Sequence, residues 1–172
     1  MENEDIITKI KDWCFSQESQ IINDHNLFQS YLVNFLKQNQ WYTYKEYEIN
    51  NYPKQLTEQS IEQATNQPST GSTTSEKVKD RTEFLDICAF AHNKKLAIEY
   101  DNTTHIKTSS IAKLLYSNAD LPIAIVHGKF GKAFLKFENT SKIKRTAKNL
   151  NITNKTIYLI VIENRIAEWV QV

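Results

Sequence analysis

The 172-residue sequence is poor in cysteine, glycine, proline and methionine. Its two cysteines, Cys14 and Cys88, form no CxxC or Cys/His pattern, so neither a disulfide framework nor a zinc site is indicated. No apolar run approaches the roughly 18 to 20 residues needed to cross a bilayer, and no charged-then-apolar leader opens the chain. We therefore expect a soluble, cytoplasmic protein with no membrane partner.

The charges are nearly balanced in number but unevenly distributed. Residues 1–75 contain ten acids and five bases, whereas residues 76–172 contain sixteen bases and ten acids. Within 129–155, eight lysines and arginines accompany one acid, Glu138. This composition predicts a basic segment that faces nucleic acid, and the alternative is a solvated lysine-rich face. The length favours one domain, residues 1–172.

The N-terminal part of the sequence has helical periodicity. Apolar residues predict two amphipathic helices in the first forty residues, with an Asn/Asp-rich break at 23–26. Residues 41–49 are rich in aromatic side chains and predict a first strand. Residues 54–80 are polar, and we expect an exposed, mobile insertion there; its start at 56–64 is compatible with a short helix.

The remainder alternates strand-like apolar runs with amphipathic, helix-like ones. The predicted strands are 83–90, 95–101, 121–127, 157–162 and 166–170. The predicted helices are one from Ser109 or Ser110 to about Asn118 and a basic one at 140–150. A helix between neighbouring strands implies a crossover connection. The order of elements predicts an α/β (α+β) domain with a mixed central sheet flanked by helices and closed by a C-terminal helix and hairpin.

Three acids fall on the two strands of the predicted hairpin. Glu99 and Asp101 are two residues apart, so they project to one face of their strand. A turn at 91–94 places Asp86 roughly opposite Glu99 or Asp101. A lone acid at a strand end is usually just exposed, but these strands are otherwise apolar, and buried like charges require a cation. Hard oxygen ligands select Mg²⁺ or Mn²⁺, which suits metal-assisted phosphodiester hydrolysis.

The segments DICAF at 86–90 and LAIEYDNTTH at 96–105 together resemble the PD-(D/E)xK, or restriction-endonuclease-like, superfamily. The resemblance is greatest to its very-short-patch-repair-like branch. That branch has an Asp-bearing strand, an I-E-x-D segment that leads to a histidine, a helix carrying a base, and a strand similar to LPIAIV at 121–126. The resemblance covers about residues 26–127 and implies an αβββαβ core.

The same resemblance implies the metal ligands. Asp86 and Glu99 would bind Mg²⁺ or Mn²⁺, and the carbonyl of Tyr100 would complete the coordination sphere. Asp101 stands where most members have a lysine that orients water and stabilises charge on phosphorus. An acid at this position would instead position water or a second metal.

Other residues would supply the remaining chemistry. Lys113 matches the base on the helix of that branch, and it or Lys107 would provide the missing positive charge. His105 would serve as a general acid or base, or contact the scissile phosphate. Further polar candidates near the metal are His127, Gln29, Glu46 and Glu48.

The expected function is that of a Mg²⁺-dependent endonuclease of restriction, repair or mobile-element type that cuts double-stranded DNA as a homodimer. The expected nucleic-acid-binding residues are Lys107, Lys142, Lys144, Arg145 and Lys148. The alternative is a nuclease-fold protein that lost catalysis with its lysine and binds nucleic acid or a partner protein. An RNA-processing enzyme on the same fold is a third candidate.

Overall fold

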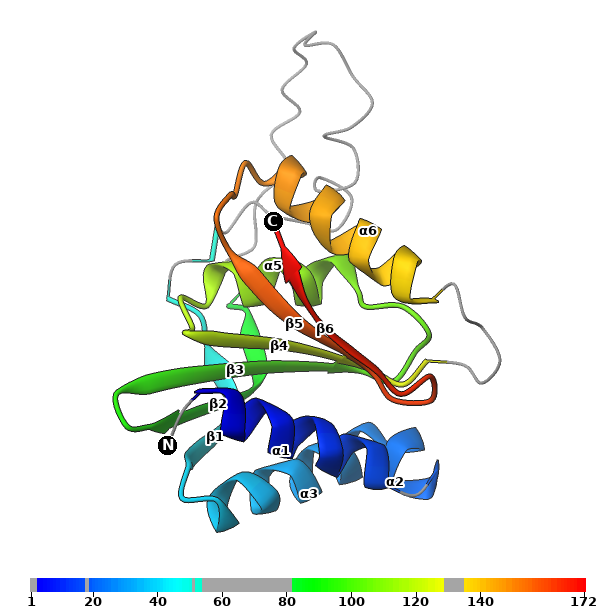
Figure 1. The fold of residues 1–172 in the computed structure, drawn as a ribbon. Helices are drawn as coiled ribbons and strands as arrows, with labels where there is room; N and C mark the ends of the chain where they lie inside the picture. The colour runs from blue at the N-terminus through cyan, green and yellow to red at the C-terminus, as the bar shows by residue number, and fades with distance from the viewer. Residues whose placement is uncertain (1–2, 18, 51, 54–81, 129–134) are drawn as a thin grey trace, which may run out of the picture.

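A computed structural model describes residues 3–17, 19–50, 52–53, 82–128 and 135–172 (Figure 1). The polar insertion and short helix expected within 54–80 lie outside the described residues, as do Lys129 and Lys132 of the basic segment. In the described part of the chain, no helix is long and apolar enough to cross a membrane.

The N-terminal part is helical, as the periodicity predicts, but its described residues form three helices instead of the predicted two. The helices are α1 (Asn3–Ser16), α2 (Ser19–Asn23) and α3 (His25–Gln38). The break between helices is shorter than the expected 23–26, because Asp24 caps α3. Its Oδ1 atom accepts a hydrogen bond from the Leu27 amide at 2.9 Å, which satisfies one of the free amides of the first helical turn.

The mixed sheet and its flanking helices are confirmed. The strands are β1 (Tyr42–Glu48), β2 (Phe84–Ala91), β3 (Lys94–Asp101), β4 (Leu121–Val126), β5 (Thr156–Val161) and β6 (Ile166–Gln171). They lie side by side in the order β1-β2-β3-β4-β5-β6. The pairs β3–β4 and β4–β5 are parallel and the other three are antiparallel.

Two crossover helices join the parallel strands, α5 (Thr108–Tyr116) and α6 (Leu135–Asn149). The helix α5 begins before Ser109 and Ser110, with Lys107 at its N-cap position. The helix α6 begins five residues before the expected 140. Its first residue, Leu135, is fully buried, so packing against the core extends the helix beyond its basic stretch.

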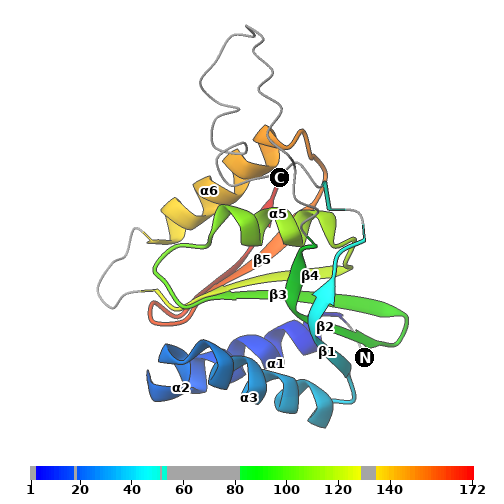
Figure 2. The same ribbon diagram turned by 180° about the vertical axis from the view of Figure 1, so that it is seen from behind.

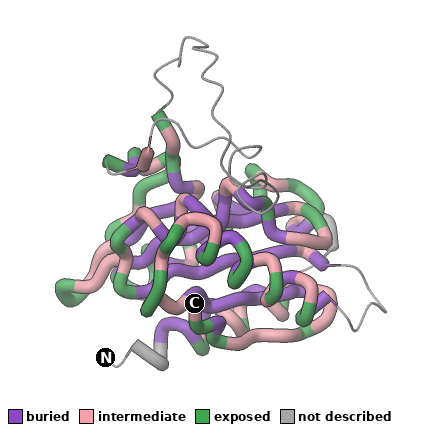
Figure 3. Tube along the Cα trace, turned by 90° about the horizontal axis from the view of Figure 1, so that it is seen from above, coloured by how far each residue is buried: buried purple, intermediate pink, exposed green. Residues whose placement is uncertain are grey.

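The helices form layers on both faces of the sheet: α1, α2 and α3 cover one face, and α5 and α6 cover the other (Figures 1 and 2). Neighbouring residues of β3 show the division, since Ile98 belongs to the same buried cluster as Phe28 of α3 and Ala97 to the same buried cluster as Ile111 of α5. Side chains alternate between the faces of a strand, so β3 contributes to both cores. Buried residues accordingly run through the central strands (Figure 3).

A tight turn sets the register of β2 against β3. His92 and Asn93 both have positive φ values, 50° and 59°, as the two central residues of a type I′ hairpin turn require. The turn pairs Ala91 with Lys94 and leads to the pair Ile87–Ile98. The next positions along the two strands are those of Asp86 and Glu99.

Gly128, just after β4, is a position that only glycine suits. Its φ is +85°, and an added Cβ would lie 2.8 Å from Val161 Cγ1 and 2.9 Å from Asn164 Oδ1. We predict that Gly128→Ala lowers the free energy of unfolding by about 1–3 kcal/mol, measured by urea denaturation. Ser141→Ala, on the exposed side of α6, is the control and should stay within about 0.5 kcal/mol of wild type. An unchanged midpoint for Gly128→Ala would contradict this prediction.

Candidate functional site

The site begins with an interruption of the sheet at Asp86. The ladder between β2 and β3 ends at the pair Ile87–Ile98. On the other side of β2, the register with β1 omits the pair between Asp86 and Glu46, whose φ of 51° is left-handed. A left-handed residue kinks a strand and breaks its hydrogen bonding. Asp86 therefore has no ladder partner on either neighbouring strand.

Two carboxylates take over the hydrogen bonds that the ladder loses. The Asp86 amide donates to Glu99 Oε1 at 3.1 Å, and the Tyr100 amide donates to Asp86 Oδ2 at 2.8 Å. Each acid thus accepts a hydrogen bond from the backbone of the other strand. The juxtaposition of Asp86 with Glu99 that the hairpin predicts is present, and these bonds hold it in place.

Lys113 of α5 compensates the charge of Glu99. The Glu99 side chain is 1 % exposed, and its Oε2 atom lies 2.6 Å from Lys113 Nζ. The ammonium group also donates to the Phe84 carbonyl oxygen at 3.0 Å. Burial, and then the charge of Asp86, raise the pKa of Glu99 to about 8, while Lys113 and the Asp86 amide act in the opposite direction. This pKa already includes the effect of Lys113, so a further cation is needed for Glu99 to be fully ionised at neutral pH.

Asp101 has a different partner. It is 2 % exposed, and its carboxylate accepts from the Lys107 amide at 2.9 Å and pairs with Lys107 Nζ at 3.1 Å. Because Lys107 is the N-cap residue of α5, Asp101 places an anion at the start of that helix, where it is favourable. No group of three His, Cys, Asp or Glu side chains that could hold a metal exists among the described residues. Asp86 and Glu99 form a pair, and Asp101 anchors α5.

The carbonyl of Tyr100 points toward the interruption. The Asp101 carbonyl oxygen accepts from the His127 amide, on the β4 side of β3. Backbone groups alternate in direction along a strand, so the polar groups of Tyr100 point to the β2 side, where its amide meets Asp86. The Tyr100 carbonyl oxygen therefore lies on the side of β3 that faces Asp86.

His25, at the start of α3, is a residue of this site that the sequence analysis missed. Its Nε2 atom lies 3.8 Å from Asp86 Oδ1 and 2.9 Å from Gln29 Nε2. Its ring stacks on Tyr100, with 5.5 Å between centroids. Gln29 was a candidate from the sequence, but nothing local indicates that His25 packs against a strand sixty residues further along the chain.

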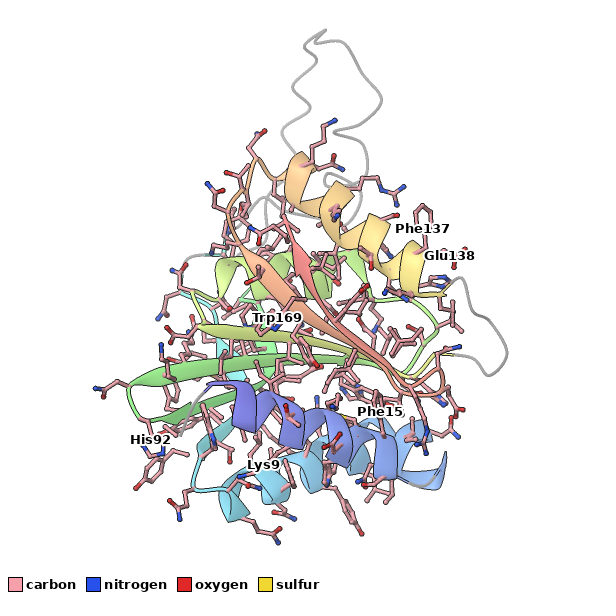
Figure 4. The ribbon with its side chains drawn as sticks, in the orientation of Figure 1. Lys9, Phe15, His92, Phe137, Glu138 and Trp169 are labelled. Atoms are coloured by element: carbon pink, nitrogen blue, oxygen red, sulfur yellow. The ribbon has the colours of Figure 1, made fainter. Side chains whose placement is uncertain are left out.

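The two predicted histidines connect loops at the carboxyl ends of the strands. His105 Nε2 lies 2.5 Å from Glu138 Oε2, at the start of α6 (Figure 4), and its Nδ1 contacts the Thr104 hydroxyl. His127 contacts Asn102 Oδ1 at 3.2 Å and Glu163 Oε1 at 3.0 Å. Both nitrogens of each ring have partners, so these histidines tie the loop after β3 to α6 and to the β5–β6 turn.

The basic residues of α6 lie on its outer side. The buried side consists of Leu135, Asn139, Ile143, Thr146 and Ala147. Lys144, Arg145 and Lys148 are exposed and Lys142 is half-buried. We call these four residues the basic face of α6. Lys107, the other predicted nucleic-acid contact, is 57 % exposed although it pairs with Asp101.

The donor set suits a hard divalent cation. Asp86 Oδ1, the Glu99 carboxylate and the Tyr100 carbonyl are all oxygen ligands, the type that Mg²⁺ and Mn²⁺ prefer. Each carboxylate has one oxygen bonded to a backbone amide, which fixes its orientation, as outer hydrogen bonds do for metal ligands generally. The residues present therefore fit the metal that the sequence analysis expects.

The raised pKa of Glu99 predicts how stability depends on pH in metal-free protein. A carboxyl whose folded-state pKa lies above its unfolded value stabilises the fold at low pH. That contribution is lost as the pH rises toward about 8. We expect Glu99→Gln to remove this loss, so that wild type becomes less stable relative to the variant between pH 5 and pH 8. Asp86 and Lys113 face the group and are unchanged in both proteins.

The measurement is urea denaturation in EDTA at several pH values between these limits. Glu48→Gln, an exposed acid on β1, is the matched control and should keep a constant difference from wild type. If the difference between wild type and Glu99→Gln were the same at pH 5 and pH 8, burial would not be acting on this acid.

Comparisons with known proteins give no family for the chain. No family model matches it, and neither the curated proteins nor the solved structures contain a match.

Proposed function

We propose that the protein is a metal-dependent DNA endonuclease of the PD-(D/E)xK type. The observation that carries this proposal is the meeting of Asp86 and Glu99 at an interrupted ladder, each held by the other strand's backbone. The order α3-β1-β2-β3-α5-β4 is also the αβββαβ order that the sequence resemblance implies. The pair lies at the start of β2 and near the end of β3.

The residues that would hold the metal are Asp86, Glu99 and the Tyr100 carbonyl. A bound divalent ion supplies Lewis-acid polarisation of the phosphate and a more acidic water. The protein contributes preorganisation, because the two carboxylates are oriented by hydrogen bonds before any substrate arrives. His25 of α3, from the helix layer on the other face of the sheet from α5, adds a polar group beside Asp86.

Lys113 supplies the positive charge that the superfamily usually places at the position of Asp101. Its ammonium group already lies against Glu99, so it is available to stabilise negative charge that develops on a phosphate held by the metal. Asp101 supports this role indirectly, because it anchors the N-terminus of the helix that carries Lys113. The acid at position 101 is therefore compatible with an active enzyme.

The substrate-binding surface in this proposal is the basic face of α6. It provides four cations that can contact the DNA backbone. The His105–Glu138 contact joins the start of α6 to the loop that follows the acids of β3. Binding of the duplex along α6 would thus bring a phosphate toward the end of β3.

Cleavage of DNA tests the proposal directly. Purified protein is incubated with plasmid, single-stranded DNA and RNA in Mg²⁺ or Mn²⁺. We expect nicking or linearisation of plasmid that is abolished by EDTA. Asp86→Asn and Glu99→Gln should each lower the rate by at least about a hundredfold, and Lys113→Met by a similar factor.

The matched control for these variants is Asp12→Asn, at an exposed acid of α1 away from the site, which should cut at the wild-type rate. Binding of DNA without cleavage in either metal would favour the alternative, a nuclease-fold protein that recognises nucleic acid without cutting it. Cleavage of RNA alone would favour an RNA-processing enzyme.

Binding through α6 should depend strongly on salt. Reversing three charges, with Lys144→Glu, Arg145→Glu and Lys148→Glu combined, should weaken duplex binding and lower the slope of log affinity against log salt by up to about three. Fluorescence anisotropy in Ca²⁺ or EDTA measures this without cleavage. A matched triple reversal of Lys9, Lys11 and Lys37, on α1 and α3, should leave the slope unchanged. Equal effects of the two triple variants would refute a specific role for α6.

A further inference from the structure

Among the described residues the open sheet has two edge strands, β1 and β6, and of these two only β1 is protected against pairing. Along β1, Glu46 is left-handed, and the strand carries the charges of Lys45, Glu46 and Glu48. A kink and charged side chains are the usual devices that keep an edge strand from pairing with another chain. The β1 edge is therefore unsuited to pairing with a strand of another chain.

The strand β6 has no such protection. Its residues, Ile166–Gln171, include no proline and no positive φ value. Its single charge, Glu168, is neutralised within the chain by Lys136 Nζ at 2.7 Å and accepts from the Thr140 hydroxyl. Trp169 (Figure 4) is 48 % exposed, and its ring contacts that of Tyr158 of β5 at a tilt of 58°, with 5.0 Å between ring centroids. Regular edge strands whose charges are neutralised within their own chain pair readily with another strand.

The hydrogen bonds around β5 show which groups of β6 point outward. The Val172 amide donates to the Lys155 carbonyl of the neighbouring chain segment. Backbone direction alternates along a strand, so Val170 and Glu168 also point toward β5. Ala167, Trp169 and Gln171 consequently present their N–H and C=O groups to the open edge.

We propose that this edge pairs with β6 of a second copy of the chain, antiparallel and about a two-fold axis at Trp169. In this register Trp169 faces Trp169 of the partner subunit, and Ala167 faces Gln171 of the partner subunit. The three pairs of outward residues exchange two hydrogen bonds each, about six in all, whereas a shift by two residues leaves two pairs and about four bonds.

Charge and packing select the same register. A shift by two residues in one direction would place Glu168 directly opposite its own symmetry copy, which like-charge repulsion disfavours. In the proposed register Glu168 lies opposite an apolar valine. The two exposed tryptophans become cross-strand neighbours, an arrangement that contributes to pairing beyond the area it buries.

The dimer would also arrange the basic faces. A two-fold axis perpendicular to the sheet keeps each face on its own side, and α6 contacts β6 through Lys136 and Thr140. The two α6 helices therefore flank the axis on one face of a continuous twelve-stranded sheet, two copies of six strands. The pairing does not depend on the proposed nuclease activity, and it is measured without DNA or metal.

A cysteine at the axis tests the register. Trp169→Cys places two thiols at facing positions with Cα atoms about 5.5 Å apart, within the range that disulfides span. Gln171→Cys is the matched control, because the two copies of residue 171 would be about 14 Å apart. We expect mild oxidation to give at least about tenfold more covalent dimer with Trp169→Cys than with Gln171→Cys. Cys14 and Cys88 are buried and are present in both variants.

Analytical ultracentrifugation tests the interface with the native side chains. Wild type should sediment as a dimer at micromolar concentration. Ala167→Pro removes an outward amide without removing a bond to β5, and Trp169→Arg adds charge; each should shift the protein to monomer, with circular dichroism verifying the fold. Tyr42→Arg on β1, where the tyrosine is 76 % exposed, should remain dimeric. A monomeric wild type, a dimer that survives in folded Ala167→Pro and Trp169→Arg, or equal crosslinking at 169 and 171 would overturn the inference.

Discussion

The arrangement of the site depends on one reciprocal interaction: Asp86 and Glu99 each accept a hydrogen bond from the backbone of the strand that carries the other acid. A sheet would normally satisfy those amides with carbonyl oxygens. The left-handed Glu46 and the end of the β2–β3 ladder free them, and carboxylates fill the places. The cost of burying Glu99 beside the half-buried Asp86 is offset by hydrogen bonds from backbone amides and by Lys113. The result is a pair of oriented acids inside an otherwise regular sheet.

The two layers of helices act on this pair from opposite sides. The N-terminal layer brings His25 and Gln29 to Asp86, and the other layer brings Lys113 to Glu99. Asp101 connects the strand to the second layer, because it binds Lys107 at the start of α5. Asp101 and Glu99 thus each pair with a lysine of the same helix layer, Asp101 with Lys107 and Glu99 with Lys113.

Local patterns predict much of this molecule because the relevant contacts are close in sequence. The alternation along β2 and β3 and the short turn between them place Asp86 beside Glu99, thirteen residues away. The predicted helix boundaries were wrong where packing overrides composition: α6 extends back to Leu135, which is buried, and α5 starts at the residue after Lys107. The three-acid cluster was an overextension of the same pattern, since alternation gives the face of Asp101 but not its partner.

Sequence alone determined the alternation of strands and helices, the hairpin, the adjacency of two acids and the basic character of α6, because each follows from neighbours within one or two turns of chain. Tertiary structure decided the interruption at Asp86, the contact with His25, the ion pair of Lys113 with Glu99 and the contrast between the two sheet edges. These depend on residues that are far apart in the chain, for which no local periodicity carries a signal. Their positions follow from how two layers of helices close over one sheet.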